Sequence, residues 1–336
     1  MRVCLEYVWI GGNQELRSKT KVVDYSDNIN YMIEWNFDGS STGQANGNES
    51  EIILKPVKII NDPIRKNGKI ILCETYFPNG DVHPSNNRFL AKQIFMRNLK
   101  EKPWFGLEQE YFMIDNNTGN PLGFCNNLVA NPQGQYYCSI GSGNSFGRNI
   151  AEEHLQACIE SGIKISGINS EVAPGQWEFQ IGPCVGIEEG DDLWLARYLL
   201  IIIAEKYNIS INFEPKPLKG NWNGSGCHAN FSTEKMRDGT TEQNGLYYID
   251  EAITKLSKKH KEHMEVYGTG NEERMSGKLE TSSFNIFTDG IANRGCSIRR
   301  GNETFKNGKG YFEDRRPSSN CDPYLVTSKI FETCCL

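Results

Sequence analysis

Two glutamates separated by one residue, Glu108 and Glu110, lie in the aromatic and apolar segment from Trp104 to Ile114. This composition predicts a β-strand that enters a core, and side chains two residues apart on a strand point to the same face. Both carboxylates would then lie beside apolar surface, where two like charges need cations to compensate them. The pair therefore predicts a divalent metal site.

Further residues of the same chemistry stand in aromatic or glycine-rich surroundings. Taken alone, a glutamate on a strand is most often solvated or salt-bridged, and a histidine beside a glycine-rich loop is more often a hydrogen-bonding side chain than a ligand. Together, several carboxylates and one imidazole suit a hard cation such as Mg²⁺ or Mn²⁺, whereas zinc would favour more histidine or cysteine. The candidate ligands are Glu108, Glu110, Glu171, Glu178, His228 and Glu313.

Arginines near glycine-rich or polar turns add positive charge to this acidic set. Guanidinium groups beside a carboxylate–metal cluster favour phosphate or carboxylate ligands, and the combination predicts phosphoryl transfer by charge neutralisation and positioning. No Walker A loop or GxGxxG motif is present, so a nucleotide site must be built differently, and a metallohydrolase stays an alternative. The candidates are Arg274, Arg294, Arg299 and Arg315. Exposed positions are expected for Arg300, Arg316, His260 and His263.

Composition narrows the class of protein. The chain has 336 residues and a net charge of −6, which permits one large or two smaller domains and gives no footprint for nucleic acid. Its longest aliphatic run, residues 199–204, is far shorter than the ~18 residues of a membrane span. The eleven cysteines show no CxxC spacing, and no secretory signal precedes them. We expect a cytoplasmic protein with reduced thiols and no membrane partner.

The elements that position these residues divide the chain near Pro84. Residues 1–84 are rich in strand and turn signals and contain a polar loop, residues 38–43. Their predicted strands are 3–10, 20–24 and 69–77. In the remainder, helices are predicted over 88–100, 149–161 (capped by Asn149 and ended by Gly162), 191–207 and 242–267. Strands are predicted at 104–114, 136–140, 163–169, 176–181, 209–213, 228–231 and 297–300.

Several segments together resemble glutamine synthetase of the eukaryotic type. They run in family order over nearly the whole chain: 35–42, 103–111, 136–138, 176–183, 216–232, 292–294 and 310–323. The resemblance implies an α+β fold with a small N-terminal β-grasp domain, residues 1–84, and a larger catalytic domain, residues 85–336. The catalytic domain would have a curved, mainly antiparallel sheet with packed helices.

The implied activity is the ATP-dependent ligation of ammonia to L-glutamate through a γ-glutamyl phosphate, giving L-glutamine, ADP and phosphate. ATP would be a co-substrate, and at least two Mg²⁺ or Mn²⁺ ions would bind each active site. One cation would lie near glutamate, on Glu110, Glu171 and Glu178. The other would bridge the ATP phosphates, on Glu108, His228 and Glu313.

The resemblance also implies roles for residues around these cations. The ATP set is Trp104, Glu108, Glu178, Asn230, Ser232, Arg294, Arg299 and Tyr311. The glutamate set is Asn221, Trp222, Asn223, Gly224, Arg274, Arg294 and Arg315. The ammonium set is Asp38, Ser41, Tyr137 and Glu280. The catalytic residues would be Asp38 as the base, Glu280 in a flap over residues 267–283, and Arg294 and Arg315 on the transferring phosphoryl group.

The resemblance further implies active sites between subunits of a homo-decamer made of two stacked pentamers. The chain departs from the family pattern in a late start, a shortened tail, and Lys278-Leu279 where an aromatic residue and a histidine usually precede the flap glutamate. Two alternatives stay open, a γ-glutamyl ligase for another amine and a catalytically inactive structural relative. The complete ammonium set argues against the first, and the complete ligand and arginine sets argue against the second.

Overall fold

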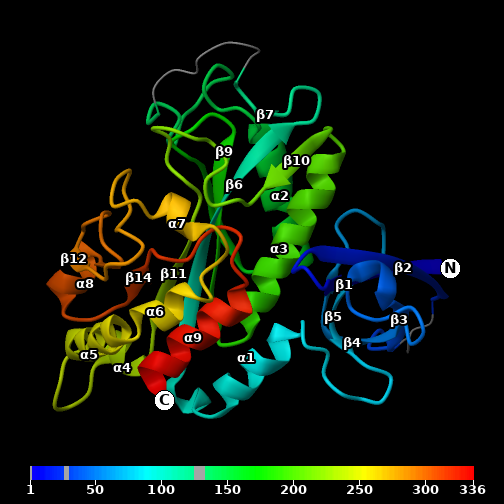
Figure 1. Cartoon of the computed structure of the whole chain (residues 1–336), viewed down its shortest axis with the longest axis horizontal. Coiled ribbons are helices and arrows are strands. Elements are labelled where there is room, and N and C mark those ends of the chain that lie inside the picture. Colours follow the sequence, from blue (N-terminus) through cyan, green and yellow to red (C-terminus); the bar gives the residue numbers. More distant parts are fainter. Residues whose placement is uncertain (1, 26–29, 125–132) are drawn as a thin grey trace.

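The computed structural model describes residues 2–25, 30–124 and 133–336, and shows two sheets joined through α1 (Figure 1). The N-terminal sheet has the order β2-β1-β5-β4-β3. Among its described residues, the strands β1 and β5 pair in parallel and all other pairs are antiparallel. Its strands are β1 (Arg2–Ile10), β2 (Leu16–Asp24), β3 (Trp35–Asp38), β4 (Glu51–Asn61) and β5 (Lys69–Tyr76). The three strands predicted for this part of the chain are confirmed.

Strands β3 and β4 were not predicted. Pro56 stands in the middle of β4, and a proline normally argues against a strand interior because it cannot donate a ladder hydrogen bond. The sheet accommodates it with a register shift between Pro56 and Lys58 opposite β5. The predicted polar loop is a short 3-10 helix, Gly39–Thr42, which Asp38 caps through the backbone N–H of Ser40.

The second sheet carries the candidate ligands. Its main path in the described residues is β12-β13-β14-β11-β6-β9-β8, with β7 and β10 also pairing with β6. All pairs except β12–β13 are antiparallel, which confirms the predicted α+β class. The strands are β6 (Trp104–Asp115), β7 (Asn120–Pro121), β8 (Ile165–Ser170), β9 (Gln176–Val185), β10 (Ile209–Asn212), β11 (Cys227–Ser232), β12 (Asp289–Ile291), β13 (Ile298–Arg300) and β14 (Phe312–Asp314).

Helices pack beside the large sheet, and α3 lies between it and the N-terminal sheet (Figure 1). Its apolar run is buried, as predicted, and forms a single core with β6 and β9. The longer helices are α1 (Asn87–Met96), α2 (Arg148–Ser161), α3 (Glu188–Glu205), α5 (Gly245–Lys258) and α9 (Pro323–Cys335). The short ones are α4 (Glu234–Asp238), α6 (His260–Met264), α7 (Asn271–Arg274) and α8 (Asn302–Asn307). None of the described helices is long and apolar enough to cross a membrane.

Three predictions of local structure were wrong. Residues 136–138 form turns and residues 139–140 have no regular structure, where a strand was predicted. Helix α2 begins at Arg148 after Gly147 in the left-handed region, so Asn149 lies inside the helix and does not cap it, although Gly162 ends the helix as predicted. The long helix predicted over 242–267 breaks at Lys259 into α5 and α6.

Two residues expected on the surface are buried. The ring of His263 bonds to the hydroxyls of Tyr267 and Thr333, at 2.7 and 2.9 Å. Arg316 forms a buried two-pronged ion pair with Asp314, at 2.9 and 2.6 Å. In both cases a hydrogen-bond partner compensates the loss of water.

Candidate active site

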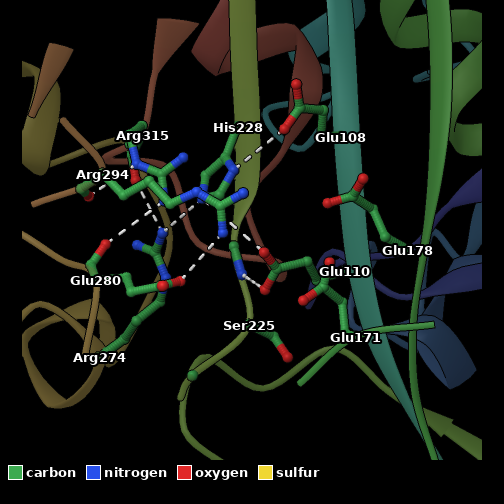
Figure 2. A network of polar contacts seen from close by, with 12 residues as sticks. Glu108, Glu110, Glu171, Glu178, Ser225, His228, Arg274, Glu280, Arg294 and Arg315 are labelled. Atoms are coloured by element: carbon green, nitrogen blue, oxygen red, sulfur yellow. Dashed lines mark hydrogen bonds and ion pairs between the residues drawn. The ribbon is translucent and has the colours of Figure 1, made fainter. Parts of the chain in front are cut away.

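The candidate metal ligands lie on neighbouring strands of the large sheet. Glu108 and Glu110 both belong to β6 and face the same cavity, as the strand pattern predicts. The strand register places His228 opposite Glu108, and Glu178 opposite Glu110. The other two ligands stand on the flanking strands: Glu171 directly after β8, and Glu313 in β14. Antiparallel pairing therefore gathers residues from distant parts of the chain on one face (Figure 2).

The ligands form two groups. In the first trio, possible ligand atoms of Glu108, His228 and Glu313 lie within 4.8 Å of one another. Nδ1 of His228 is 3.3 Å from Oε2 of Glu108 and 3.4 Å from Oε1 of Glu313. Burial, followed by the charge of Arg315, lowers the pKa of His228 well below its ordinary value. The imidazole is therefore neutral, which is the form that binds a metal.

The second trio consists of Glu110, Glu171 and Glu178, whose possible ligand atoms also lie within 4.8 Å of one another. It adjoins the first trio, since Nε2 of His228 is 4.0 Å from Oε1 of Glu110. The side-chain amide of Asn169 donates to Oε1 of Glu171 at 2.9 Å. The amide of Gln180 donates to Oε1 of Glu178.

The carboxylates of the second trio are hard to ionise without a cation. Burial raises the pKa of Glu110 to about 7. Burial and then the charge of Glu110 raise the pKa of Glu171 to about 8. Burial and then the charge of Glu108 raise the pKa of Glu178 well above its ordinary value. A divalent cation between these oxygens would remove this penalty, so the donor set fits a hard metal ion.

Two of the predicted arginines bracket the first trio. Nη1 of Arg315 lies 2.6 Å from Oε1 of Glu313, and Nη1 of Arg299 lies 2.9 Å from Oε2 of the same carboxylate. Both guanidinium groups line the cavity that contains the trios. Their fixed forks suit the oxygens of a phosphate or a carboxylate ligand.

The other two predicted arginines, Arg294 and Arg274, line the same cavity. Nη1 of Arg294 lies 3.6 Å from Oε2 of Glu280, and its guanidinium lies 5.8 Å from the ring centroid of Tyr137. Arg274 is buried, and its Nη2 lies 3.3 Å from Nε2 of His228 (Figure 2). The four arginines therefore add positive charge to the acidic wall of the cavity, and Arg274 lies beside the imidazole of His228.

Two adjoining cavities provide room for ligands. The first has a volume of about 400 Å³ and contains both trios and the four arginines. The second has a volume of about 430 Å³ and aromatic walls. Because Glu108 and Gln180 line both cavities, the first trio borders the second cavity. Besides Glu108, four other residues of the predicted ATP set line the second cavity, namely Trp104, Asn230, Ser232 and Tyr311.

The predicted glutamate set is brought together in part. The members that line the first cavity are Asn223, Gly224, Arg274, Arg294 and Arg315. Asn221 and Trp222 line neither cavity in the part of the chain that the structure describes. Trp222 instead packs edge-on against Phe124, with ring centroids 5.4 Å apart.

The predicted ammonium set is divided between the two sheets. Tyr137 and Glu280 line the first cavity, whereas Asp38 and Ser41 lie at the N-terminal sheet, outside both cavities as the described residues define them. Two hydrogen bonds from Ser40 lower the pKa of the exposed Asp38. A single chain therefore does not assemble this set.

Several polar residues of the site were not predicted. Asn169 and Gln180 line the first cavity and bond to its carboxylates. Each lies two residues from a candidate ligand, Glu171 or Glu178, so the alternation that paired Glu108 with Glu110 could have found them. Arg237 also lines the second cavity, and its guanidinium lies 3.9 Å from the ring centroid of Trp104. No spacing pattern in the sequence indicated this position.

The fold and the site together define a class of proteins that can hold divalent cations beside an anionic ligand. Residues 88–264 match the family model "Glutamine synthetase, catalytic domain". A putative glutamine synthetase of Acanthamoeba polyphaga mimivirus is 54% identical over 337 residues, which cover 98% of this chain and 94% of that protein. A cytosolic isozyme of glutamine synthetase from Pinus sylvestris is 49% identical, over 99% of this chain and 93% of the isozyme.

The comparison with solved structures agrees at the level of the fold. A cryo-EM structure of glutamine synthetase from Plasmodium falciparum aligns with a TM-score of 0.75 and 18% identity, over 98% of this chain and 70% of that chain. The chain belongs to the glutamine synthetase family.

Proposed function

We propose that this chain catalyses the ATP-dependent ligation of ammonia to L-glutamate, giving L-glutamine, ADP and phosphate. Family membership supports this reaction. The observation that carries it is the pair of adjoining ligand trios in an arginine-lined cavity, which meets an aromatic cavity at Glu108. Such a site can position a nucleotide phosphate against a second anionic substrate.

Two Mg²⁺ or Mn²⁺ ions fit the donor set of oxygens and one neutral imidazole. The first trio would hold the ion nearer the nucleotide, because Glu108 borders the aromatic cavity. The second trio would hold the ion nearer glutamate. When bound, the two ions supply neutralisation of the phosphate and carboxylate charges.

The arginines would position and neutralise the reacting groups. The γ-carboxylate of glutamate attacks the γ-phosphorus of ATP, which forms γ-glutamyl phosphate and releases ADP. Arg294, Arg299 and Arg315 would face the transferring phosphoryl group. The buried Arg274, with Asn223 and Gly224 beside it on the cavity wall, would bind the carboxylates of glutamate.

The second step needs the ammonium set. Asp38 would accept a proton from NH₄⁺, and the resulting ammonia would attack the acyl carbon and release phosphate. Tyr137 and Glu280 border the cavity, and Glu280 would close over the acyl phosphate to exclude water. Since Asp38 lies outside the cavity of its own chain, we place it in the site of a neighbouring subunit.

This arrangement supports a homo-oligomer, and we propose the decamer of two stacked pentamers. We also propose a cytoplasmic location. The cysteines of the described ranges are all free thiols, which fits a reducing compartment.

The amine substrate is the part of the reaction that most needs a direct test. Leu279 lines the first cavity beside Glu280, where the family pattern has a histidine, so another amine is the rival substrate. Phosphate release from ATP and glutamate should be measured with ammonium, hydroxylamine or putrescine, using Glu171→Gln as the inactive control. We expect activity with ammonium and hydroxylamine. Robust activity with putrescine alone would overturn the proposal.

A further inference from the structure

Two side-chain amides connect two carboxylates of the second trio. Nε2 of Gln180 donates to Oδ1 of Asn169 at 2.7 Å and also to Oε1 of Glu178. Nδ2 of Asn169 in turn donates to Oε1 of Glu171 at 2.9 Å. Because the oxygen of Asn169 accepts from Gln180, its NH₂ group must face Glu171. We call Gln180 and Asn169 the amide relay.

The sheet builds this relay through its register. Asn169 of β8 lies opposite Glu178 of β9, and Gly167 lies opposite Gln180 after a register shift that follows Ile165. A Cβ atom at Gly167 would come within 2.5 Å of Oε1 of Gln180. Gly167 therefore leaves the space that the Gln180 amide occupies.

The hydrogen bonds of the amide relay offset part of the repulsion between the carboxylates of the second trio. A hydrogen bond from an amide favours the ionised form of a carboxylate and fixes its rotation. It also occupies Oε1 of Glu178, which leaves the other oxygen of that carboxylate for a cation. The third member, Glu110, receives its hydrogen bond from the backbone N–H of Gly226 at 2.8 Å. Glu171 also accepts from the backbone N–H of Val172 at 3.3 Å, in addition to the amide of Asn169.

We infer that Asn169 and Gln180 are positioning residues for the divalent cation of the second trio, acting through Glu171 and Glu178. The inference rests on the proposed function, because cation binding at this trio is part of that proposal. Residues that orient metal ligands commonly change metal affinity by about 10–100-fold. The same range is expected here.

The test is a calorimetric titration of the metal-free, full-length protein with Mn²⁺. The variant Glu171→Gln identifies which class of sites belongs to the second trio. The near-isosteric variants Gln180→Met and Asn169→Leu should each weaken that class by about 10–100-fold and leave the other class within about threefold. The double variant should lose little more than either single one, because the two amides act as a unit.

Two further variants separate positioning from general damage. Gln156→Met removes a similar amide-to-carboxylate bond, to Glu160 at 3.0 Å on the exposed face of α2, and should leave both classes of sites unchanged. Gly167→Ala displaces the Gln180 amide without altering any donor or ligand, and should reproduce the effect of Gln180→Met. It also serves as the test if Gln180→Met does not fold.

The outcomes are distinct. Selective weakening of the second-trio class supports the relay. Unchanged Mn²⁺ binding in the relay variants, or equal weakening of both classes, overturns the relay but leaves the proposed function standing. Absence of Mn²⁺ binding to the unmodified protein overturns both.

Discussion

At the scale of single residues, protons and metal ions compete for the second trio. The ordinary carboxyl pKa is 4.5, but Glu110 and Glu171 have pKa values of about 7 and 8 in the folded chain. A cation must displace these protons, so Mn²⁺ affinity at this trio should rise between about pH 6 and pH 9, by up to about tenfold per pH unit for each proton displaced. Mn²⁺ titrations at a series of pH values measure this slope.

The first trio is the internal control, because His228 is already neutral over this range and should give a shallower slope. Equal slopes at both classes of sites would contradict the prediction. The stability of the metal-free protein should change in the opposite sense. The folded state holds protons that the unfolded state releases above about pH 4.5, so this contribution to stability is lost as pH rises through about 7 and 8.

The sequence predicted residues well where alternation decides their direction. The two-residue spacing placed Glu108 and Glu110 on one face, and the structure confirms it. Adjacent side chains in an extended segment point in opposite directions. Arg315 accordingly lines the cavity, while Arg316 is buried against Asp314. The burial of Arg316 could not be predicted, because composition assigns an arginine to the surface unless its partner is known.

At the scale of elements, a buried carboxyl group supports the strand that carries Glu108. The register between β6 and β9 shifts between Phe105 and Leu107, and the backbone N–H of Leu107 donates to Oε1 of Glu189 on α3 at 2.9 Å. Burial raises the pKa of Glu189 well above its ordinary value and so favours the uncharged form of this carboxyl group. We expect Glu189 to act as a neutral hydrogen-bond acceptor inside the core.

The variants Glu189→Gln and Glu189→Ala test this role. Glutamine keeps the acceptor oxygen and adds no charge, so the free energy of unfolding should change by less than about 1 kcal/mol. Alanine leaves the N–H of Leu107 without its partner and should cost about 1–3 kcal/mol, measured by urea unfolding at pH 7. A larger loss with glutamine than with alanine would show that the carboxylate is charged.

Elements were predicted best where local signals and tertiary packing agree. The apolar run of α3 correctly predicted that this helix is buried, and Gly162 correctly predicted where α2 ends. Prediction failed where packing overrides a local rule, as in β4, whose Pro56 is tolerated through a register shift. It also failed at His263, where the neighbouring lysines indicated an outer face although the residue lies seven positions after the buried Leu256, on the same helical face.

At the scale of the whole molecule, ion pairs join the N-terminal sheet to the rest of the chain. Arg88 of α1 contacts Glu74 of β5 at 2.7 Å and Asp191 of α3 at 2.8 Å. The side chain of Lys58 in β4 also pairs with Asp192 of α3. These contacts hold the N-terminal sheet on the side of α3 (Figure 1). Among the described residues, no residue of that sheet lines the first cavity. Asp38 lies outside the cavity of its own chain, which agrees with the proposal that it completes the site of a neighbouring subunit.

Shared sites predict complementation between inactive variants. Asp38→Ala removes the proposed base contributed by one subunit, and Glu171→Gln removes a metal ligand from the cavity of the next. When the two variants are co-expressed in equal amounts, random assembly should leave about one quarter of the sites with both intact residues. Glutamine synthesis by the mixture should then recover to about one quarter of the unmodified activity, while each variant alone stays inactive.

The matched control combines Glu108→Gln with Glu171→Gln, both of which alter the same cavity. No subunit arrangement can restore an intact cavity in that mixture, so its activity should stay at the level of the single variants. Light scattering on the same samples verifies that the subunits have assembled. Recovery in the control mixture, or none with Asp38→Ala, would rule out sites built from the N-terminal sheet of one subunit and the cavity of another.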